Sequence, residues 1–301
     1  MDLQPDDREN PRLYRRFHRG HREILTLPHL LRRQGDGAVG ADGTVDRSYN
    51  ACVTGNWLEE EAAGGWVFRP PDPPPGILIG FSGRGATPRD EPSPTGFLAR
   101  RFARSLSTDG LPIVRATQVH GSRAVIIREA PGRDETVDAG ECDILATDLP
   151  GVGLVVQTAD CVPILLAGVR SIAAVHAGWR GSARNAASAG VAALAQLDEP
   201  ASSLRAFLGP AIGACCYEVG GDVAAQFAGE FLRRSCEGRF RLDLAAVNRA
   251  QLEAAGVPPG SISPHPACTR CGSEKFASYR RDGSAAGRMI ALIARLGSPT
   301  A

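Results

Sequence analysis

Two histidines and one cysteine follow short apolar segments of this 301-residue chain, at positions where their side chains could share one ion. His120 lies in TQVHG, Cys161 in TADCVP and His176 in AVHAGWRG. Imidazole and thiolate are ligands that zinc prefers, and three protein ligands leave a fourth coordination position for water or substrate. The set therefore predicts a catalytic metal site. Cys161 and His176 could instead act as a nucleophile and its general base.

The spacing of Cys161 and His176 suggests that they face each other across a hairpin. The segments Val162–Ala167 and Ile172–Val175 are β-branched-rich and read as antiparallel strands. A two-residue turn at Gly168-Val169 would place Cys161 directly opposite His176. Opposed residues have Cβ atoms about 4.5–5.5 Å apart, which is close enough for both side chains to reach one ion.

A longer turn changes this register. With a four-residue turn, Gly178 would lie opposite Cys161, although Cys161 and His176 would remain at the same end of the hairpin. The position of His120 does not follow from its spacing.

Polar residues near these three add further chemistry. Asp143 and Asp160 are candidates to orient a ligand histidine or to transfer protons. Arg180 begins a predicted helix, where N–H groups and a guanidinium could hold an anion. Ser82 and Arg84 lie in the glycine-rich turn GFSGRG, which could bind phosphate. The candidates for binding substrate or phosphate are Ser82, Arg84, Gln118 and Arg180.

The remaining cysteines give a weaker signal. Cys268 and Cys271 have the spacing of a metal-binding or redox pair, but the chain lacks the second such pair that a zinc ribbon needs. Cys215 and Cys216 are adjacent, and we expect them to pack beneath a turn.

The order of predicted elements indicates an α/β (α+β layered) domain with a single mixed sheet flanked by helices. The predicted strands, besides the two of the hairpin, are Ile77–Phe81, Ile113–Val119, Ala124–Ile127, Val152–Gln157 and Leu204–Leu208. The predicted helices are Gly96–Leu106, Arg180–Leu197, Gly221–Arg233, Leu244–Ala255 and Ala285–Leu296.

The N-terminal quarter differs in composition from the rest. Residues 1–75 are rich in Arg, Asp and Gly and end in the proline tract Arg69–Pro75, which is typical of a semi-rigid linker. We therefore expect an extension over residues 1–75, partly disordered, and a catalytic domain over residues 76–301.

Composition excludes several classes of partner. A formal net charge of +1 gives no field that would attract nucleic acid. No apolar stretch is long enough for a membrane span, and the charged N-terminus does not resemble a secretion signal. These features predict a cytoplasmic protein, and we expect a monomer.

Five sequence strings together resemble the laccase-domain family, whose members have been called polyphenol oxidoreductases, purine nucleoside phosphorylases and peptidoglycan editing factors. In chain order they are TQVHG, TADCVPILL, AAVHAGWRG, LGPAIGACCYEVGGDV and ASYRRDG followed by GRM, and the resemblance covers about residues 77–296. It implies one α/β domain, similar to the cysteine-hydrolase-like toxin deamidases, with zinc bound by His120, Cys161 and His176.

The chain departs from this family pattern in the first glycine-rich turn. The family carries FSTRxGG followed by a longer segment rich in serine and asparagine. Here the turn is FSGRGA, with Gly83 in place of threonine, and the chain continues to a predicted helix without that segment.

The resemblance implies a zinc-dependent purine nucleoside phosphorylase that cleaves adenosine, inosine, guanosine and methylthioadenosine with phosphate and also deaminates adenosine. Arg84 or Arg180 would hold the phosphate. Asp143 or Asp160 would carry the proton when a water activated by zinc attacks the purine C6.

Three alternatives remain open. Cys161 and His176 could form a hydrolase or amidase that edits peptidoglycan precursors. A copper-dependent polyphenol oxidoreductase is a second possibility, although six histidines and only Met1 and Met289 are too few for multicopper clusters. A metal-stabilised binding module is the third, but structural zinc sites usually have four protein ligands.

Overall fold

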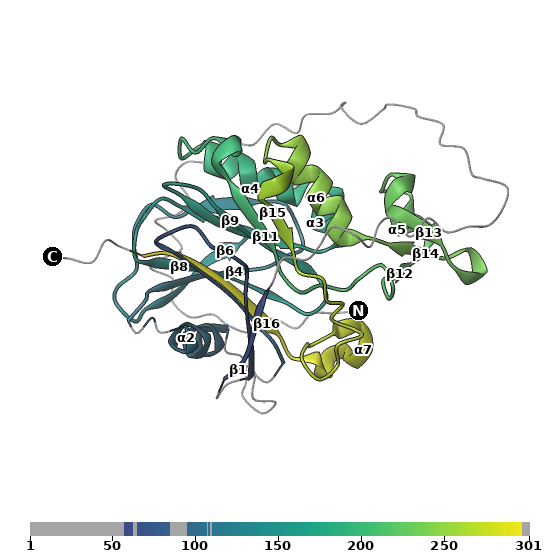
Figure 1. The fold of residues 1–301 in the computed structure, drawn as a ribbon, viewed down its shortest axis with the longest axis horizontal. Helices are drawn as coiled ribbons and strands as arrows, with labels where there is room; N and C mark the ends of the chain where they lie inside the picture. The colour runs from purple at the N-terminus through teal and green to yellow at the C-terminus, as the bar shows by residue number, and fades with distance from the viewer. Residues whose placement is uncertain (1–56, 63–64, 85–94, 107, 109, 297–301) are drawn as a thin grey trace. The chain divides into compact units, whose positions relative to one another are not determined.

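The computed structural model describes residues 57–62, 65–84, 95–106, 108 and 110–296. These belong to the larger of the chain's two units, Val53–Ala301. Two β-sheets lie face to face, with helices on their outer sides (Figure 1). The mixed α/β class predicted from sequence is confirmed, but the strands form two large sheets and one small sheet instead of a single one.

The first sheet has seven strands. In spatial order they are β1 (Leu58–Ala62), β2 (Gly65–Arg69), β3 (Ile77–Ser82), β16 (Met289–Arg295), β8 (Val152–Thr158), β4 (Ile113–Thr117) and β6 (Thr136–Glu141). β4 pairs in parallel with both β6 and β8, and the other neighbours are antiparallel.

The second sheet has six strands, and a third has three. The second contains β15 (Ile262–Pro264), β11 (Arg205–Leu208), β9 (Val162–Ala167), β10 (Ile172–Ala177), β7 (Ile144–Thr147) and β5 (Ala124–Ile126). The third contains β12 (Glu218–Val219), β14 (Phe240–Leu242) and β13 (Leu232–Arg234).

The helices are short. The α-helices are α2 (Thr95–Ser105), α3 (Trp179–Ala183), α4 (Ala186–Ala195), α5 (Gly221–Ala224), α6 (Leu244–Ala254) and α7 (Tyr279–Asp282). Single 3-10 turns occupy Ala201–Ser203, Gly229–Phe231, Cys236–Gly238, Pro259–Ser261 and Gly283–Ala286. None of the helices in the described part of the chain is long and apolar enough to span a membrane.

Alternation along the strands divides the interior into three hydrophobic layers. In β16, Ile293 faces the second sheet, whereas the next residue along, Ala294, faces α2. In β9, Leu165 packs between the sheets, whereas Ile164 and Leu166 pack against α4 and α6. Since successive strand side chains point to opposite faces, a strand covered on both sides must be apolar throughout.

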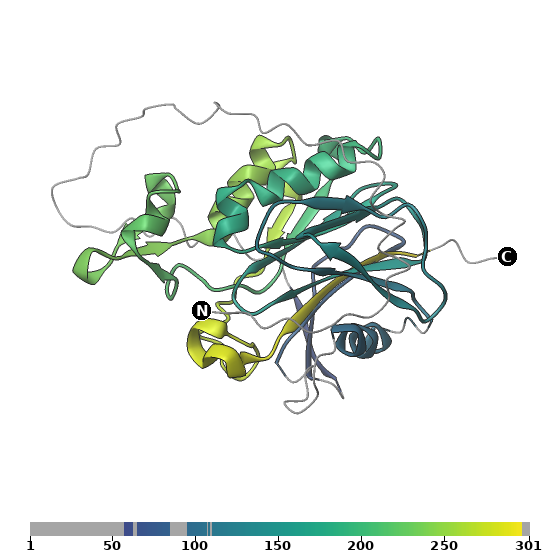
Figure 2. The same ribbon diagram turned by 180° about the vertical axis from the view of Figure 1, so that it is seen from behind.

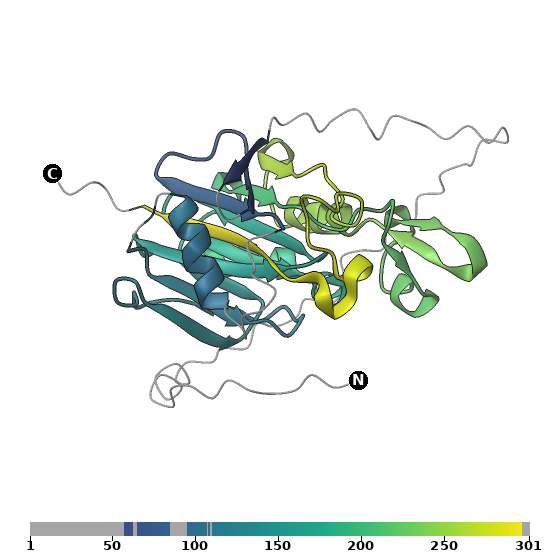
Figure 3. The same cartoon turned by 90° about the horizontal axis from the view of Figure 1, so that it is seen from below.

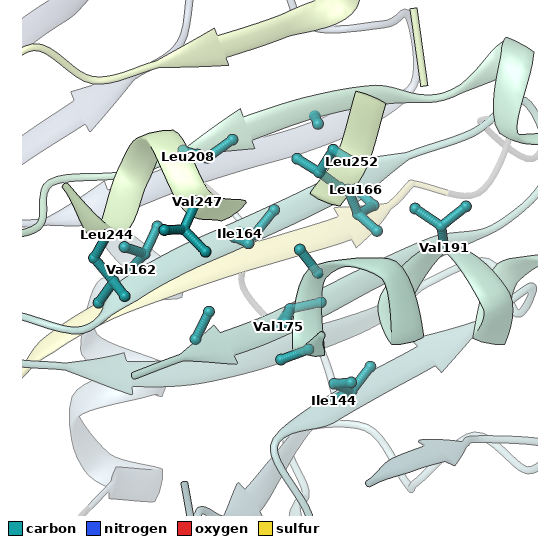
Figure 4. Close-up of a cluster of buried hydrophobic side chains, with 14 of the residues drawn as sticks. Ile144, Val162, Ile164, Leu166, Val175, Val191, Leu208, Leu244, Val247 and Leu252 are labelled. Atoms are coloured by element: carbon teal, nitrogen blue, oxygen red, sulfur yellow. The ribbon is translucent and has the colours of Figure 1, made fainter. Parts of the chain in front are cut away.

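The pictures show the resulting order of layers. Helix α2 lies across the outer face of the seven-stranded sheet (Figure 3). Helices α4 and α6 lie on the outer face of the six-stranded sheet (Figure 2). Figure 4 shows the core on that side, where residues of β9 and β10 meet Val191 of α4 and Val247 of α6.

The domain begins before Gly76, which was the predicted boundary. β1 and β2 pair with each other, and Phe68 of β2 lies opposite Phe81 of β3, so residues 58–69 belong to the first sheet. The predicted extension therefore overlaps the domain at its C-terminal end. Residues 1–56 lie outside the described residues, and the prediction of disorder there stays untested.

Three predicted helices are corrected. Ala285–Leu296 contains the strand β16, whose two-sided burial removes the alternation that would mark a strand in the sequence. Arg180–Leu197 is two helices, because Asn185 has a positive φ of 60° between α3 and α4. Gly221–Arg233 contains only the short helix α5 before the chain turns into β13.

Because β16 lies between β3 and β8, shortening one of its buried side chains should destabilise the fold strongly. Leu292 is fully buried, so Leu292→Ala should lower the free energy of unfolding by about 2–5 kcal/mol through lost burial and a cavity. Leu58 is 57% exposed in β1, so Leu58→Ala is the matched control and should change it by less than about 0.5 kcal/mol. Urea unfolding of both variants measures this, and equal effects would contradict the central position of β16.

Candidate active site

The side chains of His120, Cys161 and His176 meet at one end of the two sheets. One ligand atom from each lies within 4.8 Å of the others. His120 follows β4, Cys161 lies between β8 and β9, and His176 belongs to β10. The two imidazole rings are nearly perpendicular, with centroids 4.8 Å apart. The three residues singled out in the sequence are therefore brought together.

The hairpin reaches this arrangement in the longer-turn register. Ala167 pairs with Ile172 around a four-residue loop, and Pro163, not Cys161, lies opposite His176. The predicted two-residue turn is thus wrong, and the register continues to place Gly178 beside Cys161. A Cβ atom on Gly178 would lie 3.0 Å from Cys161 Sγ and 3.0 Å from His120 Cδ2. Glycine at this position is what allows the cysteine and His120 to approach each other.

A buried carboxylate fixes two of the three residues. Asp143 has no exposed surface, and its Oδ1 lies 2.7 Å from His176 Nδ1. The same carboxylate accepts backbone N–H bonds from His120 at 2.9 Å and Gly121 at 2.6 Å. These bonds hold His120 at a positive φ of 60°. With Nδ1 bonded to Asp143, His176 presents Nε2 to the cluster, which is the usual arrangement of a ligand histidine with a supporting carboxylate.

The electrostatics favour a thiolate at Cys161. Burial alone would raise the pKa of Cys161, but hydrogen bonds from His120 and His176 outweigh it and lower the pKa to about 6. Burial lowers the pKa of His176, yet the hydrogen bonds to Asp143 and Cys161 raise it to about 9. Burial would likewise raise the pKa of Asp143, and the hydrogen bond from His176 leads the interactions that lower it. A thiolate beside two imidazoles is a donor set that fits zinc.

Asp160 is anchored in the structure by its neighbours. It is nearly buried, its Oδ1 accepts a hydrogen bond from Thr269 Oγ1 at 2.6 Å, and its Oδ2 accepts one from Arg280 N at 2.6 Å. Its backbone carbonyl accepts the N–H of Ile212. Asp160 therefore joins the loop containing Cys161 to two segments that are distant in sequence.

The predicted substrate-binding residues divide into two groups. Ser82 is buried and its hydroxyl accepts the N–H of Ile290, so it links β3 to β16. The Gln118 amide exchanges two hydrogen bonds with the backbone of Gln157. Arg84 donates to the carbonyl of Ser273. Arg180 differs from these three because it is exposed, with its guanidinium 4.4 Å from the centre of the Trp179 ring.

Gly83, the departure from the family motif, has a packing reason. A Cβ atom there would lie 2.4 Å from the carbonyl oxygen of Lys275 and 2.6 Å from Trp66 Cβ. A threonine could not occupy this position unless the backbone at Lys275 or strand β2 moved.

Two residues near the cluster were not assigned by the sequence reasoning. Tyr217 interacts electrostatically with Cys161, Arg180 and Arg280, and burial is the main reason that its pKa rises to about 12. The Arg280 guanidinium lies 5.1 Å from the centre of the Tyr217 ring. Both residues lie within the strings that carry the family resemblance, which was the available signal.

The two cysteine pairs also come together, which the sequence reasoning did not anticipate. The Sγ atoms of Cys215, Cys216, Cys268 and Cys271 all lie within 4.8 Å of one another. Cys215 is exposed and Cys216 is half-buried, so the vicinal pair does not pack as a buried element beneath a turn.

The crowding around Gly178 predicts that an added methyl group will disturb the site. Gly178→Ala should lower the affinity of the cluster for an added metal ion by at least about tenfold, because Cys161 or His120 must shift from its present position. Gly260→Ala is the control, since nothing lies within 4 Å of a Cβ there. Competition with a zinc chelator measures both affinities, and an unchanged affinity in Gly178→Ala would contradict the geometry.

The lowered pKa of Cys161 predicts the pH dependence of its alkylation. The thiolate is the reactive form. In metal-free protein the rate at which iodoacetamide modifies Cys161 should therefore be half-maximal near pH 6 and should decrease as the pH is lowered further. Burial raises the pKa of Cys142 to about 12, so Cys142 should stay unmodified over the same range. Peptide mass spectrometry separates the two sites. A half-maximal rate near pH 9 at Cys161 would refute the thiolate assignment.

The sequence of this chain is similar to those of known proteins. Residues 84–296 match the family model described as multi-copper polyphenol oxidoreductase laccase. A purine nucleoside phosphorylase of Deinococcus radiodurans is 41% identical over 211 residues, covering 68% of this chain and 78% of that protein. A protein named adenosine deaminase RL5, from an unknown prokaryotic organism, is 36% identical over 207 residues, covering 64% and 79%.

The fold is also found in solved structures. The crystal structure of YlmD from Geobacillus stearothermophilus superposes with a TM-score of 0.69 at 30% identity, covering 80% of this chain and all of that one. The Bacillus licheniformis protein YfiH gives a TM-score of 0.68 at 27% identity, with 79% and 99% covered. Given the family match over residues 84–296 and these relatives, the chain belongs to the multi-copper polyphenol oxidoreductase laccase family.

Proposed function

We propose that this protein is a zinc-dependent purine nucleoside phosphorylase that acts on adenosine, inosine, guanosine and methylthioadenosine and also deaminates adenosine. The observation that carries the proposal is the convergence of His120, Cys161 and His176, with Asp143 fixing His176. Relatives named purine nucleoside phosphorylase and adenosine deaminase support the substrate class.

The position of Met289 favours zinc over copper at this site. One thiolate and two imidazoles suit either ion, but a blue-copper site adds a weak axial ligand, often methionine. Met289 is buried in the core between the sheets. Bound to His120, Cys161 and His176, zinc would supply Lewis-acid chemistry and activate a nucleophile at neutral pH.

The chain's own residues would position the substrates around this ion. Arg180 is exposed near Tyr217, and Tyr217 also interacts with Arg280, so two guanidinium groups border the cluster. Guanidinium groups bind phosphate through paired hydrogen bonds, and we assign phosphate binding to Arg180 with help from Arg280. Arg84 Nη1 donates to the carbonyl of Ser273 and Arg280 Nη1 to that of Glu218, so Arg180 is the main candidate of the three.

The two carboxylates near the cluster suit positioning better than proton transfer. Asp143 is fully buried behind His176, and both oxygens of Asp160 accept hydrogen bonds from protein groups. Asp143 would keep the His176 ring in the orientation that binds metal, and Asp160 would hold the loop that carries Cys161. Neither carboxylate needs to exchange a proton with substrate in this proposal.

The test is product analysis of zinc-loaded protein with adenosine. With phosphate we expect adenine and ribose 1-phosphate, and without phosphate we expect inosine and ammonia. Cys161→Ser should reduce both activities by at least about a hundredfold, because loss of this ligand would remove the zinc that polarises the substrate. Cys236→Ser is the matched control, because Cys236 is exposed and lies outside both cysteine-containing clusters. If neither pair of products forms under any metal loading, the proposed function is refuted.

One observation favours a second candidate function. Cys161 and His176 also fit a thiolate–imidazolium pair, as in hydrolases and amidases, and an amidase could edit peptidoglycan precursors. A nucleophilic Cys161 would retain activity after chelation and would be alkylated in the protein as purified. A zinc ligand would instead be protected until the metal is removed.

A further inference from the structure

A second group of potential metal ligands lies outside the active-site cluster. Cys215 and Cys216 precede β12, while Cys268 and Cys271 belong to the loop that leads to α7. More than fifty residues separate the two pairs in sequence, yet all four Sγ atoms lie within 4.8 Å of one another.

The sulfur spacing fits a single tetrahedral ion. Zinc–sulfur bonds of about 2.3 Å place the sulfurs of a tetrahedral site about 3.8 Å apart. Cys271 Sγ lies 3.8 Å from Cys215 Sγ and 3.3 Å from Cys216 Sγ. An iron–sulfur cluster of several irons would hold its ligand sulfurs further apart than one ion does. Four convergent thiolates around one ion are typical of zinc.

Backbone hydrogen bonds hold the two pairs in place. Ala211 and Cys268 form a parallel bridge, and Thr269 N donates to the carbonyl of Ala211 at 2.9 Å. Gly213 N donates to Cys268 Sγ at 3.2 Å, as backbone N–H groups often do to the sulfur of a metal ligand. The turn that follows is closed by Gly272 N, which donates to the carbonyl of Cys268.

Basic side chains surround the group. Four thiolates around a divalent ion would leave a net negative charge. The Arg241 guanidinium donates to the carbonyl of Cys215, and Arg270 interacts directly with the Cys216 thiol. Arg281 donates to the carbonyls of Thr269 and Arg270. Arg281 is itself paired with Asp282, so Arg241 and Arg270 are the groups that would offset the charge of the filled site.

A disulfide accounts for this geometry less well. Each disulfide uses two cysteines at a sulfur–sulfur distance of about 2.05 Å. Cys271 Sγ instead lies at comparable, longer distances from the sulfurs of both Cys215 and Cys216. One thiol that contacts two others at such distances is expected when all of them face a common ion.

We propose that Cys215, Cys216, Cys268 and Cys271 bind one Zn²⁺ ion in a closed site with four protein ligands, separate from the site of His120, Cys161 and His176. A zinc site with four protein ligands stabilises structure and leaves no position open for substrate. It would tie together the two segments that Asp160 also joins, because Asp160 bonds to Ile212 and Thr269 beside the two pairs. The second ion would thereby hold Tyr217 and Arg280 in place at the active site.

The experiment is metal analysis of the full chain, purified under reducing conditions. Elemental analysis should find two zinc ions per wild-type chain. Cys268→Ser/Cys271→Ser and Cys161→Ser should each retain one, and the control Cys236→Ser should retain two. Wild-type protein with a single zinc that Cys161→Ser removes would overturn the proposal. So would iron with inorganic sulfide, or a disulfide between the two pairs in protein kept reduced.

A second measurement remains decisive if the double variant fails to fold. Cys161→Ser leaves the four cysteines untouched, so zinc-edge X-ray absorption of this variant reports the second site alone. Four sulfur neighbours are expected, and nitrogen or oxygen neighbours would refute the proposed ligand set. Neither measurement depends on turnover, so failure of the proposed nucleoside activity would leave this result unaffected.

Discussion

The buried carboxylate of Asp143 is the group on which the active-site geometry depends. A buried charge is costly unless charged partners or hydrogen bonds compensate it. Asp143 meets this requirement with His176 Nδ1 and with the backbone N–H groups of Val119, His120 and Gly121. The loop after β4 must therefore wrap around the carboxylate, and in doing so it brings the imidazole of His120 to the side of Cys161 and His176.

The second sheet makes this arrangement rigid. Asp143 directly precedes β7, which pairs with β10, and the carbonyl of Asp143 accepts the N–H of His176 at 2.8 Å. The same two residues are thus joined by a backbone bond and by a side-chain bond. Since β10 is buried along its whole length, His176 has little freedom to turn away from the site. A ligand on such a strand is more precisely placed than one on a loop.

The Asp160 carboxylate holds the loops next to Cys161 in place, as the Asp143 carboxylate holds His176 of β10. It lies at φ +92° beside Cys161 and accepts hydrogen bonds from Thr269 and Arg280. Its contacts continue through Ile212 into the segments that carry the two cysteine pairs. The proposed second zinc site would hold the same two segments together. The four cysteines would then have a structural role beside the active-site cluster.

Residue types alone predicted much of the site, and local apolar patterns predicted some of the helices and strands. Strands β3, β8 and β9 and helices α2 and α6 were predicted within two residues of their observed ends, because each has a clear apolar pattern and flanking turn residues. β16 was not recognised. Like β9 it is buried on both faces, but its alanine-containing apolar run also fits a buried helix, and periodicity alone does not separate the two.

The sequence by itself determined which residue types could bind metal: His120, Cys161 and His176. Tertiary structure decided how they meet, because the loop between β9 and β10 sets a register that places Gly178, not His176, opposite Cys161. It also decided that the Asp143 carboxylate bonds to His176 and that of Asp160 to Thr269, and that two cysteine pairs more than fifty residues apart share one position. Such contacts depend on how the sheets and loops pack, and no local spacing in the chain encodes them.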